Sequence, residues 1–334
     1  MNKIEDILEK LIKQKHLTIE ESKKIAQMIF DENLSNEKIT LILTLLFQKK
    51  ETFEEIFGFV EYLKSKCKKI TLKGKIMDTC GTGGDNKNSF NFSTATSILL
   101  STFDISIAKH GNRSITSKSG SFDVLEALGI PIYDDLLKIK SYYKSHGICF
   151  LFAPYFHSSL KKISKIRMEL PFRTIFNLLG PLLNPVDLSY QLIGVSNKEN
   201  LESHARCLKE KNIRKAWIVH NENGYDELTT TSNNLIIEVH NNKISKVKKL
   251  NPKELGFTIR KEAELKGGTA SENAFIMQRL FEGESGGIRD NVVLNTAVGL
   301  LICEKVNNLK EGIDLAKKNI DNQIAYKKML ALTN

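Results

Sequence analysis

Cysteine and proline are scarce in this sequence, and no long apolar run interrupts it. Its five cysteines are an odd number and form no Cys-x-x-Cys pair, which argues against a disulfide framework and against a cysteine-based zinc site. No run of roughly 18 apolar residues is present, so we expect no membrane-spanning helix. The opening stretch IEDILEKLIKQ carries too many charges for a signal peptide. We therefore expect a soluble, cytoplasmic protein.

The chain has a net charge of +10 over 334 residues, but its lysines are scattered rather than gathered in a block. No zinc finger, RNP aromatic motif or other nucleic-acid module is present. The positive charge is compatible with nucleic acid, with an anionic small molecule, or with lysine-rich usage alone. Because no recognition module accompanies the charge, we expect a small-molecule ligand and no nucleic-acid partner.

The first 70 residues contain no proline and a single glycine, Gly58. Apolar residues recur there at helical spacing in four stretches. The pairs Thr18 with Glu21 and Thr52 with Glu55 have the spacing of capping boxes, which mark helix starts. Residues 1–70 are therefore predicted to form a small all-helical domain.

From Lys75 onward, short apolar runs rich in β-branched residues alternate with stretches of helical periodicity. This alternation is typical of a mostly parallel central sheet flanked by helices, so residues 71–334 are predicted to form a larger α/β domain. A late hairpin is expected around Asn241 and Asn242, followed by two closing helices at about 290–306 and 309–332. The strand candidates are KIMDTC, DISIAKHG, ICFLFA, YQLIGV and KAWIVH.

The first predicted strand runs into a glycine-rich segment, DTCGTGGDNKNSFNFSTATS. Gly81, Gly83 and Gly84 allow the backbone to approach a ligand closely, and NFST opens a helix whose first amides attract anions. The segment matches neither GxxxxGK[ST] nor GxGxxG, which disfavours ATP and dinucleotide binding. It predicts a phosphate-binding loop, with a purely structural turn as the alternative.

A second polar segment, KHGNRSITSKSG at 109–120, follows the strand DISIAKHG and contains one apolar residue, Ile115. The ends of successive parallel strands converge on one crevice, so the two segments together suit a ligand with several phosphates. We expect Lys109 and Asn91 to lie at the ends of elements rather than in the core. Taken alone, His110 is more often a structural histidine than a catalytic one.

Several motifs together resemble one enzyme family. GTGGD at 81–85, NFST at 91–94, KHGNRSITSKSGSFDVLEALGI at 109–130, RTIFNLLGPLLNP at 173–185 and DELTTT at 226–231 are similar to those of the anthranilate phosphoribosyltransferases, as are GGTASENA and RDNVVLNTA near the end. The resemblance implies transfer of phosphoribose from phosphoribosyl pyrophosphate (PRPP) to the amino group of anthranilate, a step of tryptophan biosynthesis. It also implies two Mg²⁺ ions per subunit, a homodimer, and helices at about 166–186 that join the helical domain.

The resemblance also assigns site residues. Anthranilate would be bound by Gly81, Asn112 and Arg167, with His110 as the candidate acceptor contact in catalysis. Magnesium would be bound by Ser93, Asp226 and Glu227. The residues that match PRPP contacts are Gly81, Gly84, Asp85, Ser89, Asn91, Phe92, Ser93, Thr94, Lys109, His110, Gly111, Asn112, Arg113, Ser117 and Ser121.

The chain departs from the family pattern at three places, where it reads HSSLK at 157–161, ELP at 169–171 and GSFD at 120–123. These departures put acceptor binding in question more than the chemistry. Two other functions stay open at this point. One is a pyrimidine nucleoside phosphorylase-like enzyme, which shares the two-domain architecture, and the other is a non-catalytic protein that binds a phosphorylated ligand.

Overall fold

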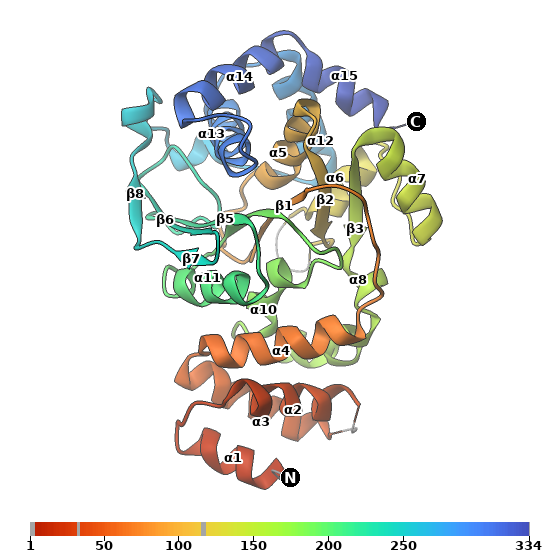
Figure 1. Ribbon diagram of the computed structural model, residues 1–334, viewed down its shortest axis with the longest axis vertical. Helices are drawn as coiled ribbons and strands as arrows, with labels where there is room; N and C mark the ends of the chain where they lie inside the picture. Colours follow the sequence, from red (N-terminus) through yellow and green to blue (C-terminus); the bar gives the residue numbers. More distant parts are fainter. Residues whose placement is uncertain (1–3, 32–33, 115–117, 334) are drawn as a thin grey trace.

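A computed structural model describes residues 4–31, 34–114 and 118–333 of the chain, which form a helical lobe and an α/β lobe (Figure 1). The predicted capping boxes at Thr18–Glu21 and Thr52–Glu55 are both formed, so the local sequence signals do start these helices. Within the described residues no helix has the length and apolarity needed to cross a bilayer. The helices of the first lobe are α1 (Ile4–Ile12), α2 (Ile19–Phe30), α3 (Asn36–Lys49) and α4 (Phe53–Lys66).

The second lobe is built on an eight-stranded sheet with the order β3-β2-β1-β4-β5-β6-β7, and β8 pairs with β6. Strands β1 to β5 are parallel to one another, while β6 is antiparallel to β5, β7 and β8. The predicted mostly parallel sheet and late hairpin are therefore confirmed. The strands are β1 (Ile76–Gly81), β2 (Ser106–Gly111), β3 (Ile148–Phe152), β4 (Tyr190–Gly194), β5 (Lys215–Asn221), β6 (Asn234–His240), β7 (Lys243–Ile244) and β8 (Lys248–Leu250).

Strand β1 lies at the point where the strand order reverses, because β2 pairs on one side of it and β4 on the other. Ligands of open α/β sheets bind in the crevice at such a point, beyond the carboxyl ends of the strands. Here those ends are Gly81, Gly111 and Gly194. The two polar segments of the sequence begin at the first two of them, so both reach one crevice.

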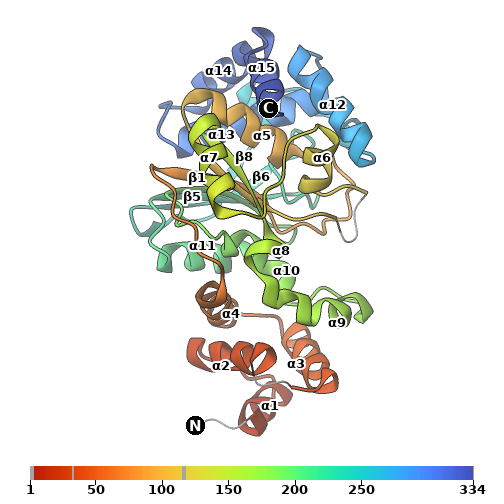
Figure 2. The same cartoon turned by 90° about the vertical axis from the view of Figure 1, so that its right-hand side faces the viewer.

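Helices cover both faces of the sheet (Figures 1 and 2). Helices α5 (Phe92–Leu100) and α13 (Gly287–Ile302) pack together on the face away from the helical lobe, with α12 (Ala270–Glu282) beyond them. Helix α11 (Asn200–Glu210) covers the other face and contacts α4. The remaining helices of eight or more residues are α7 (Leu136–His146), α14 (Leu309–Asp321) and α15 (Ile324–Ala331).

The predicted single helix at 309–332 is wrong, because the structure divides it into α14 and α15. Gln323 adopts a left-handed φ of 56° between the two. No glycine or proline marks the break, so the helical periodicity of the sequence runs across it.

The segment after β3 crosses to the helical lobe through the short helices α8 (Ala153–Phe156), α9 (Ser164–Glu169) and α10 (Phe176–Leu179). Phe176 packs edge-on against Phe30 at 5.8 Å and against Phe59 at 5.6 Å between ring centroids. This segment therefore joins the apolar core of the first lobe while it passes beside the crevice.

Candidate active site

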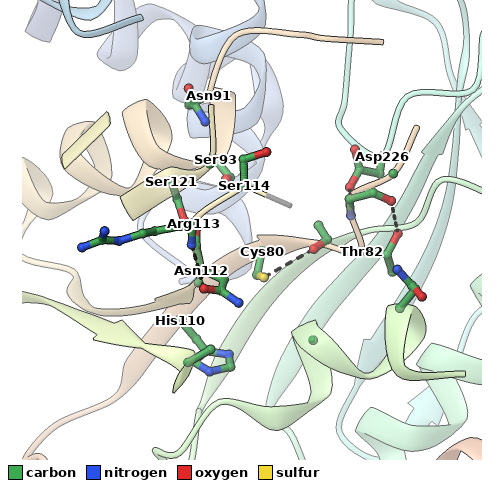
Figure 3. Close-up of a pocket in the computed structure, with 18 of the residues that line it drawn as sticks. Cys80, Thr82, Asn91, Ser93, His110, Asn112, Arg113, Ser114, Ser121 and Asp226 are labelled. Carbon is green, nitrogen blue, oxygen red and sulfur yellow. Dashed lines mark hydrogen bonds between the residues drawn. The ribbon is translucent and has the colours of Figure 1, made fainter. Parts of the chain in front are cut away.

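The crevice contains a cavity of about 390 Å³ between the strand ends and the α8–α10 segment. Asn112, Arg113 and Ser121 lie on one side of it and Asp226 on the other, with His110 beneath them (Figure 3). The structure thus brings together residues that are far apart in the sequence. The predicted residues that line the cavity are Gly81, Gly84, Asp85, Ser89, Asn91, Ser93, Lys109, His110, Gly111, Asn112, Arg113, Ser121, Arg167, Asp226 and Glu227.

The glycine loop after β1 turns because two successive residues, Gly83 and Gly84, have φ angles of +68° and +69°. Glycine adopts this region readily because it has no Cβ atom. The amide of Gly83 donates a 2.6 Å hydrogen bond to Asp226 Oδ2. At Gly81 a Cβ atom would overlap the Asp226 carboxylate, and at Gly194 it would overlap the Asp226 backbone. The loop and the acidic segment are therefore packed backbone to backbone.

Asn91 is the residue that precedes α5, but its side chain does not cap the helix. Its amide donates to Ser119 O at 3.3 Å, and its carbonyl accepts from Asn273 Nδ2 at 2.7 Å. Asn91 therefore connects the second polar segment to α12. Two further predicted positions, Phe92 and Thr94, do not line the cavity, and their side chains are fully buried.

The second polar segment is held by an acidic residue of the helix that follows it. One carboxylate oxygen of Asp123 accepts from the amides of Ser114 at 2.9 Å and Gly120 at 2.7 Å, which closes the segment at the start of α6 (Ser121–Ala127). The Ser121 hydroxyl donates to Asn112 O at 3.2 Å. The predicted contact Ser117 lies outside the described residues.

Lys109 is buried, with 2% of its surface exposed, so the expectation that it lies outside the core is wrong. Its Nζ donates to Thr79 O at 2.7 Å and to Ser93 Oγ at 3.1 Å. The cation also lowers the pKa of Asp78 and Glu227, opposing the effect of their burial. Lys109 therefore neutralises buried carboxylates as well as lining the cavity.

Asp226 is buried and Glu227 is partly exposed, and both belong to the loop after β5. Burial raises the pKa of each carboxyl, and repulsion from Asp85 raises that of Asp226 further, as repulsion from Asp226 does for Glu227. Asp85 Oδ2 is itself buried and has no hydrogen-bond partner in the described part of the chain. This excess of negative charge would be relieved by a divalent cation.

The donor set fits magnesium, which prefers carboxylate and hydroxyl oxygens and keeps several other oxygen ligands from water or substrate. Across residues 4–31, 34–114 and 118–333, no three His, Cys, Asp or Glu side chains lie close enough to form a complete metal cage. The protein would therefore provide only part of the coordination, through Ser93, Asp226 and Glu227, and the phosphates of a ligand would complete it.

The other side of the cavity is less acidic and contains His110, His157 and Arg167 beside apolar walls. The His110 and His157 rings meet edge to face, with centroids 5.4 Å apart. Burial lowers the pKa of His110 to about 3 and that of His157 to about 4, so both rings are neutral at pH 7. His110 Nε2 and Arg167 Nε are buried without a hydrogen-bond partner among the described residues. Both residues line the cavity.

The neutral histidines predict a specific dependence of stability on pH. The pKa of His157 falls from 6.5 in the unfolded chain to about 4, so its contribution to stability is present above pH 6.5 and is lost as the pH falls toward 4. We expect His157→Gln to reduce the acid-side slope of the unfolding free energy by up to about 1.4 kcal/mol per pH unit, the limit for one proton. Urea titrations of both proteins at pH 4.5 to 6.5 measure this, and equal slopes would contradict it.

The departures from the family pattern have different structural consequences. Leu160 of HSSLK lines the cavity together with His110, His157 and Arg167. Phe122 of GSFD is fully buried, packs against Phe152 at 5.0 Å between centroids and does not itself line the cavity. Pro171 of ELP is exposed. Of the three departures, therefore, only HSSLK is placed to change a ligand contact.

Sequence reasoning missed two residues that organise the site. Asn273 of α12 orients Asn91, and Arg173 contacts the glycine loop from behind. Both partners are more than 80 residues away in the chain. Both lie in motifs that support the family resemblance, but nothing local in either motif indicates its partner.

Two family models match the chain. The glycosyl transferase family helical bundle domain matches residues 5–67, and the glycosyl transferase family a/b domain matches residues 73–326. Together with the glycine loop and the acidic segment at one cavity, these matches define a glycosyltransferase of this two-part class.

Individual relatives narrow the class to one family. The anthranilate phosphoribosyltransferases of Petrotoga mobilis and Acetivibrio thermocellus are each 41% identical over 323 residues, which cover 96% of this chain and 94% and 93% of theirs. The crystal structure of the Thermus thermophilus enzyme has a TM-score of 0.90 at 31% identity and covers 98% of both chains. The chain belongs to the anthranilate phosphoribosyltransferase family, as its motifs predict.

Two solved structures of a related yeast enzyme contain ligands. The anthranilate phosphoribosyltransferase from Saccharomyces cerevisiae in complex with PRPP and Mg has a TM-score of 0.88 at 26% identity, with 97% of this chain and 94% of that chain covered. The same yeast enzyme in complex with 4-fluoroanthranilate has a TM-score of 0.87 at 25% identity, with 98% and 95% covered.

Proposed function

We propose that this chain transfers the phosphoribosyl group of PRPP to the amino group of anthranilate, giving N-(5-phosphoribosyl)anthranilate and pyrophosphate. The observation that carries the proposal is one cavity with two chemically different sides. One side has the glycine loop, Lys109 and the acidic pair, and the other has neutral histidines, Arg167 and apolar walls. The relatives named above favour this reaction over a nucleoside phosphorylase. Assays with thymidine plus phosphate and with anthranilate plus PRPP separate the two.

PRPP is proposed to bind between the glycine loop, the start of α5 and the second polar segment. Backbone amides, Lys109, Asn91 and the Ser121 hydroxyl supply donors for its phosphates and ribose. Magnesium is proposed to bind at Ser93, Asp226 and Glu227, with two ions per subunit. These carboxylates would repel PRPP unless a cation lay between them, which explains why anionic side chains line a site for an anionic ligand.

The reaction breaks the bond between C1 of the ribose and the pyrophosphate oxygen and forms one between C1 and the anthranilate nitrogen, which gives up one proton to the departing pyrophosphate or to water. Magnesium, when bound, neutralises the charge that develops on the departing pyrophosphate. The amine of anthranilate is neutral and nucleophilic at pH 7, so the chain needs no covalent nucleophile. Its residues hold donor and acceptor in line and supply hydrogen bonds to the leaving group through Lys109 and loop amides. His110 is neutral and is proposed to contact the acceptor.

Arg167 is proposed to bind the carboxylate of anthranilate, together with Asn112 and Gly81. Its guanidinium lies over the Phe176 ring at 5.7 Å, and its Nε is unpartnered within the described residues. We expect Arg167→Ala to raise the KM for anthranilate about ten- to hundredfold, because a charge-assisted contact is lost, and to change the KM for PRPP much less. Steady-state kinetics with each substrate varied in turn measure both constants.

Arg206→Ala is the matched control for this variant. Arg206 also lies over an aromatic ring, that of Phe53 at 3.9 Å, but it pairs with Glu54 away from the cavity. The control is expected to leave both constants unchanged. Equal effects of Arg167→Ala on the two substrates would remove the carboxylate assignment.

We also propose an oligomeric state and a cellular location for the protein. The helical unit of residues 1–70, joined by the segment at about 166–186, is proposed to form a homodimer in the cytoplasm. Its surface includes Ile12, Leu41 and Met168, which are 61%, 42% and 68% exposed. Sedimentation equilibrium of the purified protein gives its oligomeric state.

A further inference from the structure

Arg173 forms a cluster of hydrogen bonds with the glycine loop. Its Nη2 donates to Gly83 O at 2.6 Å and Thr82 O at 3.4 Å, and its Nη1 donates to Gly84 O at 3.1 Å. Nη1 also donates to Ser196 Oγ at 2.6 Å, just beyond β4. One planar guanidinium therefore binds three successive carbonyls and anchors them to the neighbouring strand end.

The geometry of the peptide group gives this cluster a consequence for the ligand. A carbonyl and the next N–H belong to one planar unit and point in opposite directions. When Thr82, Gly83 and Gly84 turn their carbonyls toward Arg173, the amides that follow turn away from it. The Gly83 amide is bound by Asp226. Among the described residues the amides of Gly84 and Asp85 have no hydrogen-bond acceptor, so they remain for an anion.

Arg173 acts from outside the cavity. Gly83 and Gly84 line the cavity and Arg173 does not. A Cβ at Gly84 would overlap the guanidinium, so the arginine lies directly against the backbone of the loop. The side chain therefore supports the loop and is not placed to touch a ligand itself.

The residues around Arg173 connect it to the acceptor side. Its neighbour Phe172 stacks on Phe47 of α3, with ring centroids 4.4 Å apart and an angle of 17° between the planes. Arg167, which lines the acceptor side of the cavity, lies six residues before Arg173 in the same segment. One segment, fixed to the helical lobe, thus carries both the acceptor arginine and the support of the donor loop.

We propose that Arg173 is a positioning residue that sets the affinity for PRPP by holding Gly83 and Gly84 in the conformation that directs loop amides into the cavity. The proposal rests on the function proposed above. It assigns a role to a residue that touches neither substrate, and it links the donor loop mechanically to the segment that binds the acceptor.

Calorimetric titration with PRPP and Mg²⁺ tests this on the full-length wild type, Arg173→Ala and Arg173→Lys. We expect the Kd for PRPP to rise about tenfold or more in Arg173→Ala and by less in Arg173→Lys, which keeps the charge but loses the planar fork. The KM for anthranilate at saturating PRPP should change much less than that Kd. Guanidinium ion added to folded Arg173→Ala should restore part of the affinity, which a loss of general stability would not allow.

Arg289→Ala is the control, because Arg289 also donates to a backbone carbonyl, that of Gly283 at 2.8 Å, and pairs with Asp321 outside the cavity. It should bind PRPP like the wild type. Wild-type affinity in both Arg173 variants would overturn the proposal, as would an equal loss in Arg289→Ala or no rescue of folded Arg173→Ala. If Arg173→Ala does not fold, Arg173→Lys decides. A wild type that bound no PRPP would instead contradict the proposed function.

Discussion

Replacing Asp226 with Asn and Glu227 with Gln in one variant is expected to lower turnover by about 100-fold or more, which is the scale on which a preorganised charge contribution to the transition state is lost. The two carboxylates are proposed to bind the magnesium that accompanies PRPP. Their amide replacements keep shape and hydrogen bonds but remove the charge. The magnesium concentration for half-maximal activity should therefore rise as well.

The melting temperature of the double variant distinguishes a metal-binding role of the two carboxylates from a structural role. Burial raises the pKa of both carboxyls, so their ionised forms are unfavourable in the folded protein without metal. The double variant should therefore melt at the wild-type temperature or above it at pH 8. Glu222→Gln is the control, because Glu222 follows the same strand but pairs with Lys249 at 2.8 Å. If the double variant kept wild-type turnover at limiting magnesium, Asp226 and Glu227 would be ordinary loop residues and the metal assignment would be wrong.

The second large effect is expected for Lys109→Ala, which should raise the Kd for PRPP by roughly ten- to hundredfold through loss of charge-assisted hydrogen bonds. It should also lower the melting temperature, because buried carboxylates such as Asp78 lose their cation. Asn91→Ala should weaken PRPP binding with a smaller loss of stability. Calorimetric titration and thermal melts measure both quantities.

Lys215→Ala is the matched control for Lys109→Ala. Lys215 is also poorly exposed and donates to a backbone carbonyl, that of Leu301 at 3.1 Å, at the opposite end of the sheet. It should lose stability without losing PRPP affinity. If Lys109→Ala and Asn91→Ala both bound PRPP like the wild type, the phosphate site would lie elsewhere.

The elements that the sequence predicted correctly are those with strong local signals. The capping boxes at Thr18 and Thr52 start α2 and α4 as expected, because a helix start depends on residues within one turn. The hairpin turn at Asn241 and Asn242 has φ angles of 48° and 60°, a region in which asparagine is enriched. The turn of the glycine loop could also be predicted, because glycine readily adopts positive φ angles.

The features that the sequence did not predict depend on tertiary packing. Lys109 lies in a strand that is buried through most of its length, and the carboxylates of Asp78 and Glu227 that interact with its charge belong to other segments of the chain. The break at Gln323 has no glycine or proline to signal it. In the sequence nothing distinguishes Arg173 from the other arginines. Its contacts depend on the fold, which places it behind the glycine loop. The partners of Lys109 and Arg173 lie far from them in the chain.

The central claim, that this chain joins PRPP to anthranilate, is tested most directly by the fluorescence of anthranilate. We predict that the fluorescence falls when the wild-type protein, PRPP and magnesium are all present, at a rate proportional to enzyme concentration. Omitting PRPP or chelating the magnesium should stop the loss. Constant fluorescence in the complete mixture, from folded protein that binds PRPP in a parallel titration, would contradict the claim and leave a protein that binds a phosphorylated ligand without catalysis.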